Sequence, residues 1–203
     1  MDYFKVVNSM RKIVENSLAE ALKTLQEFIA DKTALDAIET AGNLMADSIL
    51  GGGKIIACGN GGSLCDATHF AEELTSRFRK DRFPIPAISI NDPAYITCTV
   101  NDFSPDDIFS RYVEAFAKNG DVLLAISTSG NSQNVLNAVK SAKERGMKVV
   151  ALTGKGGGKL AEVADVEIRA PQSVYSDRAQ EIHIKIIHIL VECIEAKVVY
   201  KTV

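Results

Sequence analysis

Apolar residues follow two patterns along the chain, a helical spacing and short continuous runs, and these patterns divide the chain into predicted helices and strands. Residues 3–30 lack glycine and proline and carry apolar side chains every three to five positions, and a second helical stretch follows from about Thr33 to Leu50. This spacing lines one face of a helix, and glycines 51–53 are a strong stop signal. Because no strand separates the two stretches, we expect a helical hairpin that packs on the core or on another subunit.

The remainder of the chain alternates short apolar runs with helical patterns. The runs have the length and β-branched content of buried parallel strands. They cover residues 55–58, 87–90, 121–126, 148–152 and 166–169. We therefore predict an α/β fold with a five-stranded parallel sheet and helices on both faces, a flavodoxin-like three-layer sandwich. No long linker appears, so residues 1–203 are predicted to form one domain, with 1–53 as a helical extension.

Composition and charge exclude several classes of protein. The 203 residues are 46% hydrophobic and carry a net charge of −3. Neither a basic patch nor an apolar run of eighteen residues nor a secretion leader is present, so we expect a soluble cytoplasmic protein that binds neither nucleic acid nor membranes. The densest basic cluster, residues 77–82, is interrupted by Asp81. The four cysteines form no CxxC pair and are expected to be reduced structural thiols.

The segment 54–73 concentrates candidate chemistry. Its predicted strand runs into Gly59-Asn60-Gly61-Gly62, and Ser63 is the expected N-cap of the next helix. Backbone N–H groups at such a turn can receive an anion. Leu64 occupies the third glycine position of a dinucleotide fingerprint, which argues against a nucleotide cofactor. The other glycine-rich segment, 154–158, lacks a P-loop ending, and we interpret it as a tight turn without a ligand.

A cluster of hydroxyl side chains follows the clearest buried strand. Its members stand at a helix N-terminus: Ser127, Thr128, Ser129 and Ser132. Capping explains one or two hydroxyls at such a place, but it does not readily explain four. Hydroxyls together with free N–H groups suit a phosphate monoester. The sequence therefore predicts a phosphate site in this loop.

Histidines, a carboxylate and an amide supply a second candidate site. His69 and Glu73 share one face of a predicted helix. At this spacing a surface ion pair is the commoner arrangement. The alternative is that the two side chains ligate a metal ion or act as acid and base. On the last predicted helix, Gln180 and His188 are about 12 Å apart along the axis, too far to ligate one ion from one straight helix. If both serve active sites, these sites differ and require a subunit interface, whereas a lone histidine on an apolar helix is often only packed.

Several segments together resemble one family of proteins. They are CGNGGSLCDATHFAEEL, INDPAYITCTVNDF, DVLLAISTSGNSQNV, GMKVVALTGKGGGKLAEVADVEI and DRAQEIHIKIIHILVE. This set resembles the sugar isomerase (SIS) domain family and, within it, the bacterial phosphoheptose isomerases. The resemblance covers nearly the whole chain. The serine loop alone is typical of the wider family, and the combination of His69, Glu73, Gln180 and His188 narrows it to the isomerases.

The resemblance implies an aldose–ketose isomerase. It implies conversion of sedoheptulose 7-phosphate to D-glycero-D-manno-heptose 7-phosphate through an enediol, the first step towards ADP-heptose and the heptose of lipopolysaccharide. Glu73 and His188 would transfer protons. The serine loop would hold the phosphate, and the remaining substrate contacts would come from Asn60, Gly61, Gly62, Ser63, Asn101, Asp102 and Gln180.

The resemblance also implies a cofactor and an assembly. One Zn²⁺ per subunit would be held by His69, Glu73, Gln180 and His188, and the subunits would form a homotetramer with active sites at their interfaces. The alternative function is a non-catalytic SIS module that binds the replication initiator protein or senses a sugar phosphate. Such a module lacks matches to Glu73 and His188, so their presence favours the enzyme. An isomerase for another sugar phosphate is a further alternative.

Overall fold

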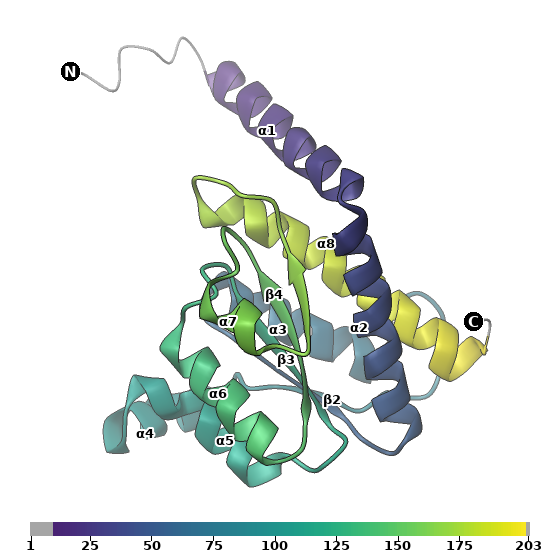
Figure 1. Ribbon diagram of the computed structural model, residues 1–203, viewed down its shortest axis with the longest axis vertical. Coiled ribbons are helices and arrows are strands. Elements are labelled where there is room, and N and C mark those ends of the chain that lie inside the picture. The colour runs from purple at the N-terminus through teal and green to yellow at the C-terminus, as the bar shows by residue number, and fades with distance from the viewer. Residues whose placement is uncertain (1–9, 202–203) are drawn as a thin grey trace.

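A five-stranded parallel sheet forms the centre of the computed structural model, which describes residues 10–201. The strands are β1 (Ile55–Gly59), β2 (Ala87–Ser89), β3 (Val122–Ser127), β4 (Lys148–Thr153) and β5 (Val166–Arg169). Their order across the sheet is β2-β1-β3-β4-β5, and every neighbouring pair is parallel. This confirms the predicted sheet and its doubly wound class (Figure 1).

Helices cover both faces of the sheet, as predicted. The elements outside the sheet are α1 (Met10–Ala30), α2 (Lys32–Leu50), α3 (Gly62–Thr75), α4 (Pro93–Asp102), η2 (Pro105–Asp107), α5 (Ile108–Phe116), α6 (Gln133–Glu144), α7 (Gly158–Val163), α8 (Ser176–Glu195) and η3 (Ala196–Tyr200). Alternate residues along a strand point to opposite faces. Those on one face of β3, such as Leu124, pack with α2, α3 and α8, and those on the other, such as Leu123, pack with α5, α6 and α7. The fold is therefore a three-layer sandwich.

Burial explains why the central strands lack an alternating pattern. Every residue of β1 and of β3 is buried, because helices cover both sides. Asp121 precedes β3 and is 1% exposed. Its carboxylate accepts hydrogen bonds from the Lys54 backbone N–H, the Lys54 Nζ and the Lys118 backbone N–H. These bonds hold the starts of β1 and β3 in register.

The two N-terminal helices are present but do not form the predicted hairpin. Only Asp31 separates α1 from α2, and helical hairpins use longer connections. Asp31 caps α2 by accepting from the backbone N–H groups of Thr33 and Ala34. In Figure 1, α2 lies along the body, while α1 continues away from it. The expectation of a helix over residues 3–30 is met from Met10 onward, and residues 3–9 lie outside the described residues.

One smaller prediction, at the start of α3, was wrong. Ser63 is not the N-cap of α3, because the helix already begins at Gly62, with Gly61 in the capping position at a φ of +54°. Asn101 and Asp102 lie in the last turn of α4. Ser63, Asn101 and Asp102 thus all lie inside helices.

Within residues 10–201, no helix has the length and apolar character needed to cross a lipid bilayer.

Candidate active site

The loops that carry the predicted site leave two neighbouring strands. β1 and β3 pair so that Gly59 lies opposite Ile126, and the glycine turn and the serine loop therefore start side by side. The helices that follow diverge, because α3 packs on one face of the sheet and α6 on the other. In doubly wound sheets, such a divergence at the carboxyl ends of the strands is where ligands bind.

Three titratable side chains converge where α3 meets α8. The Nε2 atoms of His69 and His188 are 3.0 Å apart, and His69 Nε2 is 3.3 Å from Glu73 Oε1. One atom from each of the three residues lies within 4.8 Å of the others. The Glu73 side chain is 15% exposed and that of His69 is 40% exposed. The cluster is therefore half-buried and open on one side.

The geometry of this cluster fits a metal ion. Atoms bound about 2.0–2.2 Å from a tetrahedral Zn²⁺ are themselves separated by about 3.3–3.5 Å. The contacts of 3.0 and 3.3 Å at His69 Nε2 are close to that spacing. Two histidine nitrogens and one carboxylate form a donor set that catalytic zinc sites use, with the fourth position left for water or substrate.

The packing of α3 against α8 brings the cluster together within one chain. Gly62 lies against Gln180, and His69 lies against His188 seven and eight residues later, so the two helices run parallel. His188 thus reaches His69 and Glu73 without a second copy of the chain, which the sequence argument did not foresee. Gln180 contacts Gly62, about two turns of α3 before His69, and stands apart from the three-residue cluster.

A buried ion pair fixes the ends of these two helices. The Arg82 guanidinium pairs with Glu195 through Nε–Oε1 at 2.8 Å, and both side chains are under 5% exposed. The same guanidinium donates to the backbone carbonyls of Glu73 and Leu74 at the end of α3. Arg79 pairs with Glu192 one turn earlier on α8. The basic cluster noted in the sequence thus clamps the helix that carries Glu73 to the helix that carries His188.

The serine loop presents its hydroxyls to one another rather than to the helix end. Ser127 Oγ is 3.0 Å from Ser132 Oγ and 3.5 Å from Ser129 Oγ. Ser132 is the N-cap residue of α6, yet its side chain makes no capping hydrogen bond. Thr128 follows Ser127 and is half-buried. Helix capping therefore does not explain why hydroxyl side chains gather in this loop. They form a polar cluster at the start of α6, a helix of twelve residues.

The glycine-rich segment 154–158 supports the serine loop. Gly130 has a φ of +64°, and a Cβ there would collide with the Gly157 carbonyl. Leu160 donates its backbone N–H to the Gly130 carbonyl, and Lys159 donates its own to Asn131 Oδ1. These glycines let the two loops pack backbone against backbone. Residues 154–158 thus form a turn, as expected, and the backbone of this turn packs against the serine loop.

The predicted sugar contacts divide into two groups. Asn60 lies in the glycine turn, and its side-chain amide pairs with that of Asn134 on α6. Asn101 and Asp102 bond to each other at 2.7 Å, and Asp102 accepts from Cys98 Sγ. Among the described residues, no hydrogen bond links the Asn101–Asp102 pair to the glycine turn or the serine loop.

Sequence reasoning missed Asp66, which lies one turn before His69. It is 8% exposed, and its Oδ2 has no hydrogen-bond partner among the described residues. Burial raises the pKa of the Asp66 carboxyl to about 6, although the nearby His69 acts in the opposite direction. The spacing Asp66, His69, Glu73 along one helix face could have revealed it.

The third histidine belongs to the core. His183 is fully buried on α8, and its Nε2 lies 2.8 Å from the Thr153 carbonyl oxygen. The ring therefore donates Nε2–H to that carbonyl. Burial lowers the pKa of His183 to about 4, so it stays neutral. The commoner interpretation of a histidine on an apolar helix is right for His183, and His188 differs by facing α3.

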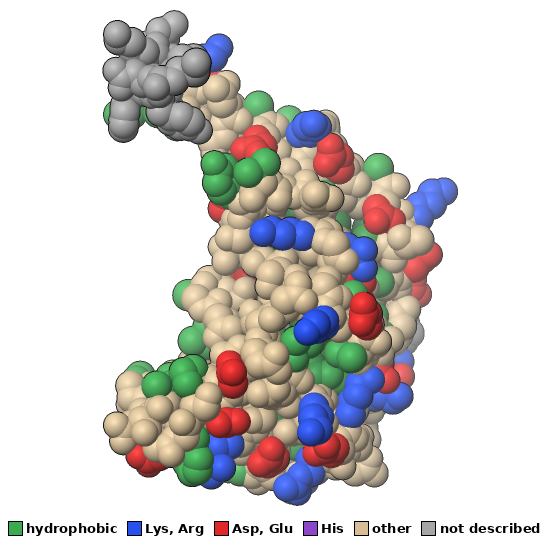
Figure 2. All heavy atoms as spheres, turned by 60° about the vertical axis from the view of Figure 1, so that its left-hand side comes forward, with side chains coloured by type: hydrophobic (Ala, Val, Ile, Leu, Met, Phe, Trp, Pro, Cys, Tyr) green, Lys and Arg blue, Asp and Glu red, His purple; other side chains and the backbone are tan. Residues whose placement is uncertain are grey.

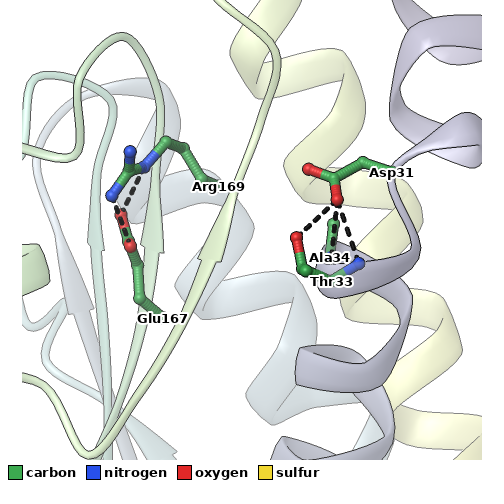
Figure 3. Close-up of a pocket in the computed structure, with 5 residues that line it drawn as sticks. All are labelled: Asp31, Thr33, Ala34, Glu167 and Arg169. Atoms are coloured by element: carbon green, nitrogen blue, oxygen red, sulfur yellow. Dashed lines mark hydrogen bonds and ion pairs between the residues drawn. The ribbon is translucent and has the colours of Figure 1, made fainter.

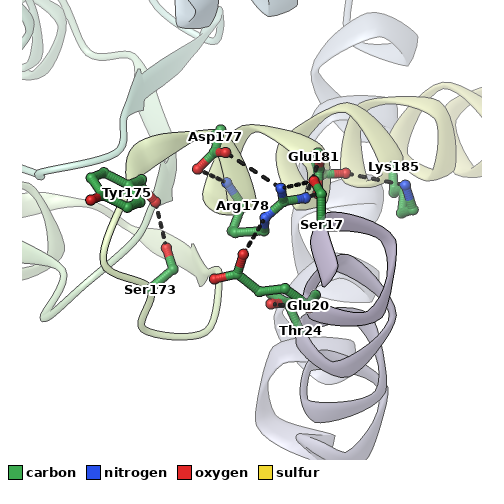
Figure 4. A network of polar contacts seen from close by, with 9 residues as sticks. All are labelled: Ser17, Glu20, Thr24, Ser173, Tyr175, Asp177, Arg178, Glu181 and Lys185. Atoms are coloured by element: carbon green, nitrogen blue, oxygen red, sulfur yellow. Dashed lines mark hydrogen bonds and ion pairs between the residues drawn. The ribbon is translucent and has the colours of Figure 1, made fainter. Parts of the chain in front are cut away.

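Two further polar groupings lie outside the site. One is a hollow with a volume of about 340 Å³. Its facing walls carry the Glu167–Arg169 pair and the Asp31 cap (Figure 3), and each of these groups is hydrogen-bonded by its own neighbours. In Figure 4, Arg178 at the start of α8 contacts Ser17 and Glu20 of α1 and Glu181 one turn on. This second group ties α1 to the helix that carries Gln180 and His188.

Comparison with known proteins gives concordant results. The SIS domain family model matches residues 18–154. The chain is 58% identical to the phosphoheptose isomerases of Escherichia coli O7:K1 and of an Enterobacter species, over 92% of this chain and 97% of each relative. A solved structure of the phosphoheptose isomerase from Neisseria gonorrhoeae is 41% identical with a TM-score of 0.86, and the match covers 93% of this chain and 100% of that one. The structure of a phosphoheptose isomerase from Francisella tularensis is 35% identical with a TM-score of 0.87, and the match covers 92% of this chain and 98% of that one.

Proposed function

The chain belongs to the phosphoheptose isomerase family of SIS-domain proteins and is an aldose–ketose isomerase, and we propose that it converts sedoheptulose 7-phosphate to D-glycero-D-manno-heptose 7-phosphate. The observation that carries this proposal is the meeting of His69, Glu73 and His188 within one chain. In the proposed pathway, the product is the precursor of ADP-heptose for lipopolysaccharide, which fits a protein of the cytoplasm.

Glu73 and His188 are the proposed acid–base pair. Isomerisation requires removal of the proton on the carbon beside the carbonyl, which leaves an enediol, and return of a proton to the neighbouring carbon. We assign the carbon-bound proton to the Glu73 carboxylate, which is largely shielded from water. The His188 imidazole can take a hydroxyl proton and return it to the other oxygen, because a neutral imidazole both donates and accepts.

The serine loop is the proposed phosphate site. Three hydroxyls already face one another there, and each can turn to donate to a phosphate oxygen. The start of α6 adds backbone N–H groups and the positive end of the helix dipole. Such a site needs no cluster of basic residues, which agrees with the net charge of −3.

The sugar is proposed to lie between the serine loop and the α3–α8 cluster. Asn60 and Gly61 connect β1 to α3, Gly62 and Ser63 are the first residues of α3, and Gln180 lies against Gly62. We propose these residues as the substrate contacts. Asn101 and Asp102 remain proposed contacts at the end of α4.

A Zn²⁺ ion is the proposed cofactor, one per chain. His69, Glu73 and His188 would hold it, and Gln180 would complete the predicted set only from another copy or after a rearrangement. When bound, such an ion polarises a carbonyl and stabilises the negative charge of an enediolate. Ligation would make Glu73 a weaker base, so we rank its acid–base role first.

We also propose a homotetramer with active sites near subunit interfaces. The outer part of α1 supports an assembly, because it exposes apolar side chains at helical spacing: Met10, Ile13, Val14, Leu18 and Leu22. Figure 2 shows hydrophobic side chains on the surface near the top of the molecule, where the outer part of α1 lies. An apolar stripe of this kind marks a contact surface for another protein chain.

Incubation of the purified protein with sedoheptulose 7-phosphate, followed by NMR, tests the function. We expect the heptose 7-phosphate to appear, and prior treatment with a chelator to slow the reaction if the metal takes part. Absence of turnover with sedoheptulose 7-phosphate, together with turnover of a different ketose phosphate, would replace the proposed substrate.

A further inference from the structure

Asn134 joins the two loops of the proposed site. Asn60 Nδ2 donates to Asn134 Oδ1 at 2.9 Å, and Asn134 Nδ2 donates back to Asn60 Oδ1 at 3.0 Å. Asn60 belongs to the glycine turn after β1, and Asn134 is the second residue of α6, after the serine loop of β3. Because α3 and α6 lie on opposite faces of the sheet, this amide pair bridges the crevice where the two layers diverge.

Asn134 is itself held in place. Its Oδ1 also accepts the backbone N–H of Val135 at 3.0 Å, which ties the side chain to the first turn of its own helix. Val135 is fully buried, so this first turn is anchored in the core. The orientation of the Asn134 amide is therefore set by α6, and the amide in turn sets the orientation of Asn60.

The reciprocal pairing leaves Asn60 free to bind a ligand. A side-chain amide carries two N–H donors and two acceptor lone pairs. The pair with Asn134 uses one of each, so Asn60 keeps one donor and one acceptor in fixed directions. A flexible and exposed asparagine would have to be ordered when substrate binds, and prior ordering removes that cost.

We propose that Asn134 is a positioning residue that pre-orients Asn60 and sets the spacing between the phosphate loop and the sugar-binding turn. This inference rests on the proposed function, since it assumes that phosphate and sugar are bound by these two loops. Substrate must contact both loops at once, whereas inorganic phosphate contacts only the serine loop. Loss of the amide pair therefore weakens binding of the sugar phosphate and leaves binding of free phosphate unchanged.

The test compares Asn134→Ala with a matched control. Asn137 lies one turn further along α6 and is also bonded through both amide atoms, to Gln133 and to the Asp106 carbonyl, and neither partner belongs to the glycine turn. We expect Asn134→Ala to raise KM for sedoheptulose 7-phosphate about tenfold with kcat within about twofold, the scale of losing one orienting contact. Asn137→Ala is expected to leave KM unchanged.

Two further measurements separate positioning from general damage. In an Asn60→Ala background, adding Asn134→Ala is expected to change KM by less than about twofold, because the two residues act as a unit. The inhibition constant of inorganic phosphate is expected to stay the same in Asn134→Ala. An unchanged KM in Asn134→Ala, an equal rise in KM in the Asn60→Ala background, or weakened inhibition by phosphate would each overturn the inference. An inactive wild type would instead contradict the proposed function itself.

Discussion

At the scale of single residues, the three histidines of the chain have different surroundings and different roles. His69 and His188 face each other beside Glu73, and His183 donates to a backbone carbonyl inside the core. The difference between His183 and His188 follows from the helical rotation of five residues along α8. It directs one ring towards β4 and the other towards α3.

Measurements of Zn²⁺ affinity can distinguish His69 and His188 from His183. We expect His69→Ala and His188→Ala each to weaken Zn²⁺ binding at least about tenfold in calorimetric titrations of the dialysed protein, because each removes one of the three proposed ligands. His183→Gln is the matched control and should bind Zn²⁺ as the wild type does. Equal Zn²⁺ affinities in the wild type and the three variants would contradict a metal site at His69 and His188.

The buried His183 also makes stability depend on pH. Its pKa of about 4 in the folded chain lies below the ordinary value of 6.5, so the unfolded chain takes up a proton first as pH falls. The contribution of the neutral ring is complete above pH 6.5 and is lost as pH falls towards 4. Asp66 acts in the opposite sense, because its pKa is raised to about 6 and protonation favours its buried form.

Comparison with His183→Gln isolates this effect. Between pH 7.5 and pH 4.5, the wild type should lose about 2 kcal/mol more unfolding free energy than His183→Gln, measured by urea denaturation. The glutamine can still donate to the Thr153 carbonyl but does not titrate. Parallel pH profiles for the two proteins would show that His183 is not a buried neutral ring.

At the scale of elements, the site depends on how α3 is held against α8. Arg82 joins the end of α3 to Glu195 in a pair whose side chains are almost fully buried. Removing one partner leaves the other charge buried without compensation, which costs about 3–5 kcal/mol. The pair thus maintains the geometry that brings His188 to Glu73.

Glu195→Gln tests this clamp. We expect it to lower the unfolding free energy by about 2–4 kcal/mol in denaturant titrations, because Arg82 keeps its backbone partners but loses its counter-charge. Glu192→Gln, at the exposed Arg79 pair, should change stability by less than about 1 kcal/mol. Similar losses in both variants would mean that burial does not distinguish the two pairs.

The elements themselves were largely predictable from sequence, and their contacts were not. All five strands and the parallel class follow from apolar runs and turn residues. The pairing of Arg82 with Glu195 joins residues 113 positions apart, and that of Asn60 with Asn134 joins residues 74 positions apart, so no local pattern encodes either pair. The resemblance placed His69 and His188 in one site, but their meeting within a single chain was not foreseen, since the spacing of Gln180 and His188 describes one helix and not its neighbour.

At the scale of the whole molecule, α1 is the element that a single chain leaves least covered. Of its described residues only Thr24 and Phe28 are buried, and Leu18 is 66% exposed. Arg178 nevertheless fixes α1 to the start of α8 through Ser17 and Glu20 (Figure 4). An assembly through α1 would therefore lie close to the helix that supplies Gln180 and His188.

A charge placed on the α1 stripe tests the proposed tetramer. Leu18→Glu should shift the sedimentation mass from four chains to a smaller species, because burying a carboxylate in an apolar interface is strongly unfavourable. Lys23→Glu, on the exposed polar side of the same helix, changes charge without entering the stripe and should sediment as the wild type does. A wild type that sediments as a monomer, with full activity, would contradict the assembly.

The central claim is that this chain isomerises a sugar phosphate with Glu73 as the base. Turnover of sedoheptulose 7-phosphate by the wild type and by Glu73→Gln, with circular dichroism to verify the fold, tests it most directly. The amide keeps the size of the side chain but cannot accept the carbon-bound proton. We expect turnover by the wild type and a loss of at least about a thousandfold in the variant, within the range for removal of a general base. Undiminished turnover by a folded Glu73→Gln protein would contradict the account.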